Sequence, residues 1–211
     1  MTRVPARDCA LCPRLAAFRE QNQVAYPDFF NAPVPSFGGS DAELLIVGLA
    51  PGLKGANRTG RPFTGDYAGE LLYATLDEFG FSTGAFGARP DDGLSLHNCR
   101  ITNAVRCVPP ENKPSSAEVR ECGRFLRDEL EALPRLRIVL ALGALAHGAV
   151  LSALDLRPSR YRFAHGAFHC LPDERSLADS YHCSRYNTNT GRLTADMFRA
   201  VFREIAARLG R

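Results

Sequence analysis

The sequence predicts an α/β fold, a three-layer α/β/α sandwich around a mainly parallel sheet. Two nearly continuous apolar runs, at 43–49 (ELLIVGL) and 137–142 (RIVLAL), are typical of strands that are buried on both faces. Another strand is expected at 100–105 (RITNAV), and segments with helical spacing of apolar residues separate the three. Strands that alternate with helices favour a parallel sheet that is covered by helices on both sides.

The other elements follow from helical spacing and capping signals. The helix before the last long strand begins at Ser115 or Ser116, and Glu118 is placed to complete a capping box with Ser115. By contrast, 81–96 is rich in glycine and proline, and we interpret it as a surface connection. The expected helices lie at 13–23, 70–79, 116–133, 144–154 and 194–209, and two shorter strands are expected at 168–171 and 177–181.

Length and composition are those of one globular domain that covers residues 1–211. Hydrophobic residues make up 45% of the chain and charged residues 23%, which is ordinary for a protein with a packed core. No apolar run approaches the roughly 18 residues that a membrane span needs, and the first residues contain no apolar signal core. We therefore expect a cytoplasmic protein without membrane contact. Its formal charge of +3 permits an anionic partner but does not require one.

Seven cysteines are many for a reducing compartment, and their odd number fits a disulfide framework poorly. One Cys-x-x-Cys pair precedes the first helix, a third cysteine follows a strand, and a fourth lies in the next helix. These four are Cys9, Cys12, Cys107 and Cys122. Their thiolates could surround a [4Fe–4S] cluster or a tetrahedral zinc ion, and spacing alone does not separate these from plain core packing. Core packing is also the expectation for Cys99 and Cys170.

Three loops follow predicted strands, and in parallel sheets ligands bind beyond the carboxyl ends of the strands. These loops begin after Leu49, Val105 and Tyr181, so we expect them to converge on one cleft. The first loop opens with GLAPG, whose glycines would let a ligand approach the backbone closely. The residues of this segment are Gly48, Leu49, Ala50, Pro51 and Gly52.

Side chains in the first two loops suit an extruded nucleobase. Phe63 could stack on such a base, with Asp66 beside it, although a core anchor and a helix N-cap are the plainer interpretations of these two residues. Asn103 ends a buried strand, and its amide could read a pyrimidine edge at two atoms or simply be a satisfied turn asparagine.

The third loop places His182 just past a strand, where an imidazole could act as an electrophile or a proton donor. Ser184 and Arg185 follow directly and suit contact with a phosphate. Each basic residue taken singly is more typical of a solvated surface. The candidate phosphate contacts are Arg58, Arg61, Lys113 and Arg185.

In combination these motifs resemble the uracil-DNA glycosylase superfamily, in particular the family 5 (type b) enzymes of its iron–sulfur branch. The matching text is CALC, GLAPG, NRTGRPFTGD, ITNAVRCVPP, Cys122 and SYHCSRYNTNTGRLT, which together span residues 9 to about 194. The resemblance implies a four-stranded parallel sheet between helices. It also implies a [4Fe–4S] cluster on Cys9, Cys12, Cys107 and Cys122, which decides between the two metal centres.

The resemblance also carries roles for single residues. GLAPG matches a motif that holds a polar, water-positioning residue in other branches and lacks one here, and Asp66 matches the acid that takes over. Phe63 matches the ring that stacks on the flipped base, and Asn103 matches the residue that reads the base edge. His182 matches the histidine of a His-Pro-Ser motif, which here is His-Cys-Ser, so we expect a less rigid loop. Tyr186 stands where relatives carry a leucine wedge.

The expected function is hydrolysis of the N-glycosidic bond of uracil in single- or double-stranded DNA, which leaves an abasic site. A pocket without a polar group in GLAPG would also admit hypoxanthine, xanthine or other damaged bases. The alternatives are a non-hydrolytic module that binds uracil or abasic DNA, an iron–sulfur electron carrier, and a zinc module. Relatives that bond DNA covalently carry a histidine-containing insertion, which KGANRTGRPFTGD lacks. We expect DNA as partner and a monomer.

Overall fold

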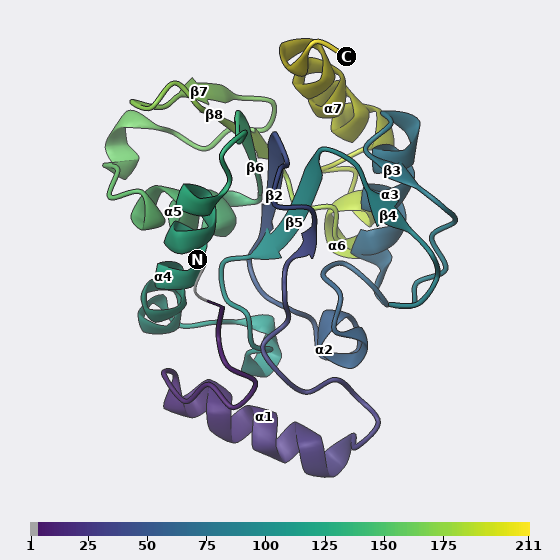
Figure 1. Ribbon diagram of the computed structural model, residues 1–211, viewed down its shortest axis with the longest axis vertical. Helices are drawn as coiled ribbons and strands as arrows, with labels where there is room; N and C mark the ends of the chain where they lie inside the picture. Colours follow the sequence, from purple (N-terminus) through teal and green to yellow (C-terminus); the bar gives the residue numbers. More distant parts are fainter. Residues whose placement is uncertain (1–3) are drawn as a thin grey trace.

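The computed structural model describes residues 4–211 and has one six-stranded sheet at its centre (Figure 1). The four inner strands run parallel, as the alternation of strands and helices predicts. The two outer strands are antiparallel to their neighbours, so the expected count of four strands is too low by two. Across the sheet the order is β1 (Phe37–Gly38), β5 (Cys99–Asn103), β2 (Leu44–Gly48), β6 (Ile138–Leu142), β8 (Ser176–Ser180) and β7 (Phe168–Cys170).

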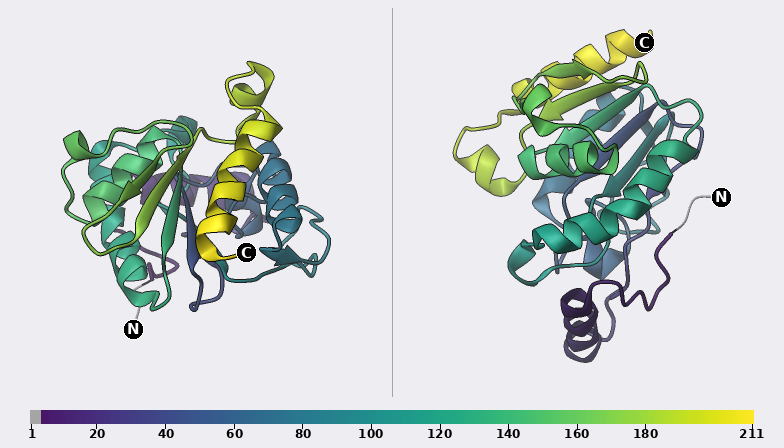
Figure 2. Two further views of the ribbon diagram at one scale, coloured as in Figure 1. Left: turned by 90° about the horizontal axis from the view of Figure 1, so that it is seen from above. Right: turned by 90° about the vertical axis from the view of Figure 1, so that its left-hand side faces the viewer.

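Helices cover both faces of the sheet, which confirms the three-layer sandwich (Figure 2). On one face, α3 (Tyr67–Glu78) and α7 (Ala195–Leu209) enclose a core with alternate residues of the inner strands. On the other face, α4 (Ser116–Ala132) and α5 (Ala144–Ala153) enclose the second core. Because neighbouring strand residues point to opposite faces, strands that serve two cores must be apolar throughout.

The helix ends follow the local capping signals. The side chain of Ser115 accepts a hydrogen bond from the Glu118 amide, and the Glu118 carboxylate accepts one from the Ser115 amide, so the predicted capping box is present. The N-terminal helix α1 (Pro13–Ala25) lies apart from the sheet, at the bottom of Figure 1. It is anchored by Leu15, which packs with Val105, Cys122 and Phe125 in a third small core.

Short elements that the spacing of apolar residues does not predict complete the structure. They are α2 (Ala56–Thr59), α6 (Arg185–Asn189), the ribbon of β3 (Ser82–Thr83) and β4 (Ser95–Leu96), and the 3-10 turns η1 (Pro110–Asn112) and η2 (Pro158–Arg160). No helix in the part of the chain that the structure describes is both long and apolar enough to cross a membrane.

The interpretation of 81–96 as a surface connection is wrong in part. Phe81 and Leu94 are buried in the core beneath α3 and α7. Asp92 accepts two hydrogen bonds from the guanidinium of Arg61, at 2.8 and 2.6 Å, and both side chains are almost fully buried. This pair fastens the segment to the loop that carries Phe63. Arg61 is therefore an internal ion-pair residue and no phosphate contact, which corrects the sequence expectation.

Candidate active site

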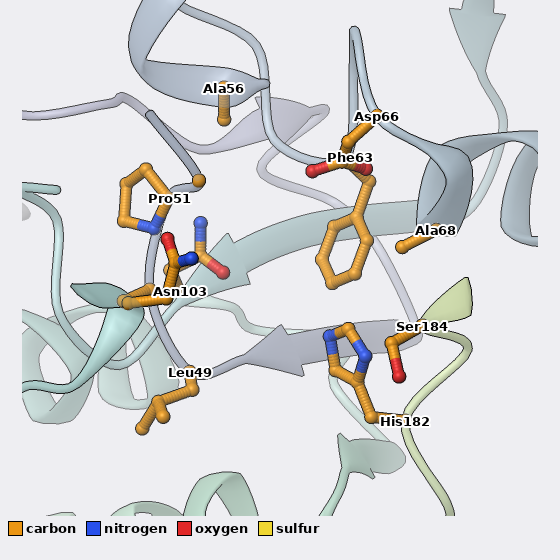
Figure 3. A pocket seen from close by; sticks show the side chains of 12 residues that line it. Leu49, Pro51, Ala56, Phe63, Asp66, Ala68, Asn103, His182 and Ser184 are labelled. Carbon is orange, nitrogen blue, oxygen red and sulfur yellow. The ribbon is translucent and has the colours of Figure 1, made fainter. Parts of the chain in front are cut away.

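A pocket of about 320 Å³ opens at the carboxyl ends of the inner strands (Figure 3). Its size falls in the range that small-molecule sites occupy. The three loops that follow β2, β5 and β8 all contribute to it, so the predicted convergence is confirmed. The lining residues are Leu49, Ala50, Pro51, Gly52, Ala56, Phe63, Asp66, Ala68, Asn103, Asn112, His182 and Ser184.

Gly48 lies directly beneath two pocket residues, because it lets the side chains of Asn103 and Phe63 approach the backbone of β2. A Cβ atom at this position would lie 2.5 Å from Oδ1 of Asn103 and 2.7 Å from Cζ of Phe63. Real Cβ atoms do not make such contacts, so any larger residue here would displace the amide, the ring or both. Gly48 is therefore a steric requirement of the site, although it does not line the pocket itself.

Phe63 and Asn103 are held firmly in place. Phe63 has a positive φ of 55°, which is uncommon for a bulky residue, and only 7% of it is exposed. Asn103 is the last residue of β5 and lies opposite Gly48 in the parallel register of β2 and β5. It is 3% exposed, so its amide is presented at the pocket floor by a buried strand.

Asp66 occupies the N-cap position of α3, but its side chain accepts no capping hydrogen bond. The carboxylate instead faces the pocket next to Phe63 (Figure 3) and lies over the turn at Gly52 and Gly55. Although the side chain reaches solvent through the pocket mouth, the enclosing protein raises the pKa of Asp66, and the nearby amides of Gly69 and Ala68 oppose that rise only in part. A raised pKa of this kind is a common feature of acids that take part in proton transfer or orient a water in an active site.

His182 lies across the pocket from Asp66, and its ring stacks against Phe63 with centroids 5.9 Å apart and planes at 30°. Burial lowers the pKa of His182, because a charged imidazolium is disfavoured where water is excluded. The ring is therefore neutral near pH 7. One of its nitrogens then carries a proton that it can donate to a ligand.

The loop that carries His182 has Cys183 at the position where the His-Pro-Ser pattern has proline. Two hydrogen bonds hold this loop in place. Asn187 Nδ2 donates to the carbonyl of His182 at 2.8 Å. The buried thiol of Cys183 donates to the carbonyl of Ala68 at 3.3 Å, which links the loop to α3. Ser184 lines the pocket and also caps α6, because its hydroxyl accepts from the Asn187 amide. These bonds restrain the segment that we expected to be less rigid.

The basic candidates differ in their placement. Arg58 is exposed on the short helix α2, Lys113 is exposed directly after η1, and Arg185 is exposed with its guanidinium 5.2 Å from the centre of the Tyr67 ring. Arg185 does not line the pocket, so it is no direct base contact. Tyr186, in the first turn of α6, is 73% exposed.

Asn112 is the polar pocket residue that the sequence analysis missed. It ends the turn η1 with a φ of 56°, directly after Glu111 with a φ of 55°. Two successive left-handed residues that are not glycine are unusual and cluster at functional sites. The asparagine that follows VPPE was the available signal, because asparagine tolerates this conformation better than most residues.

The four clustered cysteines line one small cavity between the segment before α1, the loop after β5, and α4. Burial raises the pKa of Cys12 to about 12 and that of Cys107 to about 11, and the neighbouring cysteines add to both shifts. Two nitrogen donors lie at this cavity: Arg19 Nη1 donates to the Cys9 carbonyl at 2.9 Å and approaches Cys107 Sγ at 3.9 Å, and the Arg106 amide donates to Cys122 Sγ at 3.3 Å. Donors of this kind stabilise thiolates that ligate a positively charged centre.

The single cysteines do not join this cavity. Cys99 and Cys183 are fully buried in the core beneath α3 and α7, as expected for Cys99. Cys170 is exposed, so the expectation of core packing is wrong for this residue. It lies on the edge strand β7, which no neighbouring strand covers on its far side.

Comparison with known proteins places these features in context. A family model described as the uracil DNA glycosylase superfamily matches residues 35–206. A type-5 uracil-DNA glycosylase of Thermus thermophilus is 48% identical over 93% of this chain and 91% of its own length. Proteins of the same description from Pyrobaculum aerophilum and Mycobacterium leprae are each 41% identical, over 96% and 93% of this chain and 90% and 89% of their own lengths.

Proposed function

Since this chain belongs to the uracil DNA glycosylase superfamily, we infer that its pocket receives a base extruded from DNA and that Asp66, Asn103 and His182 carry out the reaction. The protein is a DNA repair glycosylase that removes uracil. The single observation that supports the residue assignment is the meeting of an acid, an amide and an imidazole from three separate segments of the chain in one pocket.

Hydrolysis of an N-glycosidic bond develops two opposite charges. The sugar gains oxocarbenium character, while the departing base gathers negative charge on its carbonyl oxygens. We assign the base side to His182, whose neutral ring donates a hydrogen bond to O2 of uracil and strengthens it as charge develops.

Asp66 serves the sugar side of the reaction. Its carboxylate lies across the pocket from His182, where its negative charge stabilises the cationic sugar and its oxygens orient the attacking water (Figure 3). Asn103 holds the pyrimidine edge with both atoms of its amide, and Phe63 stacks on the face of the base. The walls at Leu49, Ala50 and Pro51 carry no polar side chain, so we propose that hypoxanthine and xanthine are also accepted.

We assign a [4Fe–4S] cluster to Cys9, Cys12, Cys107 and Cys122. One zinc ion bound to thiolates at 2.3 Å would hold the sulfurs only about 3.8 Å apart. Among the described residues, no three of these four sulfurs lie within 4.8 Å of one another, which supports the wider cluster. When bound, the cluster supplies a structural cross-link, since hydrolysis transfers no electrons. The four cysteines then join three parts of the chain: the segment before α1, the loop that follows Asn103 at the end of β5, and α4.

DNA would bind across the mouth of the pocket. Arg58, Lys113 and Arg185 are exposed cations near it and would contact phosphates without regard to sequence. We propose that Tyr186 enters the base stack in place of the extruded nucleotide, because it is a large aromatic side chain, 73% exposed, two residues after Ser184 at the pocket. We also propose that the protein acts as a monomer, since the pocket is complete within one chain.

The test is single-turnover formation of abasic sites on oligonucleotides that carry one uracil. Asp66→Asn and His182→Ala should each lower the rate about 100- to 1000-fold, the usual effect of removing one transition-state contact. The matched controls are Asp77→Asn, an exposed acid on the same helix, and His97→Ala, an exposed histidine. Near-normal rates in both pocket variants would refute the assignment. DNA binding without any turnover by the unaltered protein would favour the non-hydrolytic module.

A further inference from the structure

Three ligating side chains meet on the far side of the sheet from Phe63, away from the pocket. They are His147 on α5, His169 on β7 and Asp179 on β8, and their ligand atoms all lie within 4.8 Å of one another. His147 Nδ1 is 2.7 Å from Asp179 Oδ1, and His169 Nε2 is 3.2 Å from Asp179 Oδ2. None of the three lines the active-site pocket or the cysteine cavity.

The negative charge of Asp179 has unusual surroundings. The side chain is completely buried, and its recorded ion pairs in the described chain are with these two imidazoles. Its remaining hydrogen bond comes from the amide of Ala164, at 3.4 Å. A buried carboxylate is costly unless a positive charge compensates it, and a protonated imidazole or a bound cation can supply that charge.

The hydrogen bonds of His147 also call for a positive charge next to Asp179. Its Nε2 lies 2.9 Å from the carbonyl of Tyr161, which can only accept, so Nε2 carries the proton of the neutral ring. Nδ1 then turns a lone pair toward the carboxylate of Asp179. Two lone pairs do not face each other at 2.7 Å, so a positive centre lies between these atoms, either a second proton on the ring or a metal ion.

We propose that His147 Nδ1, His169 Nε2 and one oxygen of Asp179 bind a divalent transition-metal ion of the zinc class. Two imidazoles and a carboxylate are the donors that such ions prefer, whereas calcium and magnesium prefer oxygen alone. Tetrahedral bonds of about 2.0–2.1 Å place neighbouring donors about 3.3 Å apart. The 3.2 Å between His169 and Asp179 matches this value, and the 2.7 Å between His147 and Asp179 would widen by about 0.6 Å when the ion binds. The bond from His147 to Tyr161 is the outer contact that orients a metal-bound histidine.

The site would join three parts of the chain. It connects α5 to both strands at the β7 edge of the sheet, and Asp179 lies three residues before His182 on the same segment. Phe163 and Tyr161 pack edge-on against the two imidazoles and shield the donors. The side chain of His169 is 18% exposed, so water has a route to the fourth coordination position. The ion would therefore stabilise the strand that leads into the catalytic loop.

The experiment measures metal uptake on protein whose iron and sulfide content is intact, so that the four cysteines remain occupied. After dialysis against Zn²⁺, the unaltered protein and the exposed-histidine control His97→Ala should each retain one zinc per chain, and His169→Ala should retain none. At a hundredfold excess of Zn²⁺ over its Kd, the melting temperature of the unaltered protein should rise by about 5–10 °C. His169→Ala should show no rise.

Cobalt distinguishes this site from the cysteines. Co²⁺ bound by two imidazoles and a carboxylate gives visible d–d bands without the intense near-ultraviolet thiolate bands. If His169→Ala does not fold, His169→Gln and Asp179→Asn take its place, with circular dichroism as the check. No uptake, equal uptake by the variants, or thiolate bands in the cobalt spectrum would each overturn the proposal. None of these measurements depends on glycosylase activity.

Discussion

Replacing Gly48 with alanine tests the geometry of the pocket most directly. The added Cβ would lie 2.5 Å from the Asn103 amide oxygen and 2.7 Å from the Phe63 ring, whereas ordinary contacts begin at 3.4 Å. One or both groups must therefore move by close to 1 Å. Neither can move at low cost, because Asn103 is 3% and Phe63 7% exposed.

A displacement of 1 Å in positioning groups costs about a hundredfold in rate. We therefore expect Gly48→Ala to lower kcat/KM for uracil-containing DNA by about two orders of magnitude. Overpacking of a filled core should also lower the free energy of unfolding by about 1–3 kcal/mol. Single-turnover abasic-site formation measures the first effect, and urea unfolding measures the second.

Gly148→Ala is the matched control for this substitution. Gly148 lies inside α5, and an added Cβ there meets no atom within 4 Å. Alanine should leave the rate unchanged and raise stability by about 0.5–1 kcal/mol, since glycine weakens helix interiors. In the double variant Gly48→Ala with Asn103→Ala, the two losses should not add, because one amide mediates both. A Gly48→Ala enzyme within twofold of normal would show that the pocket tolerates the shift and would refute the reasoning.

Four other expectations follow from the same structure. Because the pKa of Asp66 is raised and the reaction needs its carboxylate, the acid limb of kcat/KM should lie above the ordinary aspartate range near 3.9, and a limb at or below it would contradict the role. Since burial lowers the pKa of His182, any inflection from its protonation should lie below the ordinary imidazole value of about 6.5, and pH profiles measure both effects. Arg61→Ala leaves Asp92 buried without its partner and should lower the free energy of unfolding by about 3–5 kcal/mol in urea melts, whereas a change below 1 kcal/mol would show that the pair is dispensable. A bound [4Fe–4S] cluster gives a broad absorbance near 400 nm, which Cys122→Ser should abolish while it lowers the melting temperature. An unchanged spectrum would exclude Cys122 as a ligand.

Local patterns were sufficient for the layers of the fold and for the convergence of the site. The inner strands β2 and β6 are recognisable because both of their faces are apolar, and Ser115 and Glu118 interact across three residues. The loops after β2, β5 and β8 meet because parallel strands end at one edge of the sheet.

What sequence reasoning missed depends on contacts between distant segments. The edge strand β1 has two residues and exists only through its pairing with β5. Arg61 is predicted to be a surface cation, yet it pairs with Asp92, thirty-one positions later. Asn112 enters the pocket through an unusual backbone conformation rather than through any periodic pattern.

The pairing of Gly48 with Asn103 in adjacent parallel strands limits how this pocket can be redesigned. If either strand shifted its pairing register by one residue, its side chains would turn to the opposite face of the sheet, and both cores would be disrupted. The position of the Asn103 amide in the pocket therefore cannot be adjusted by small changes in β2 or β5. An engineer who wants an enzyme for bulkier lesions would vary the rim at Ala50 and Asn112, which belong to loops, and leave the floor untouched.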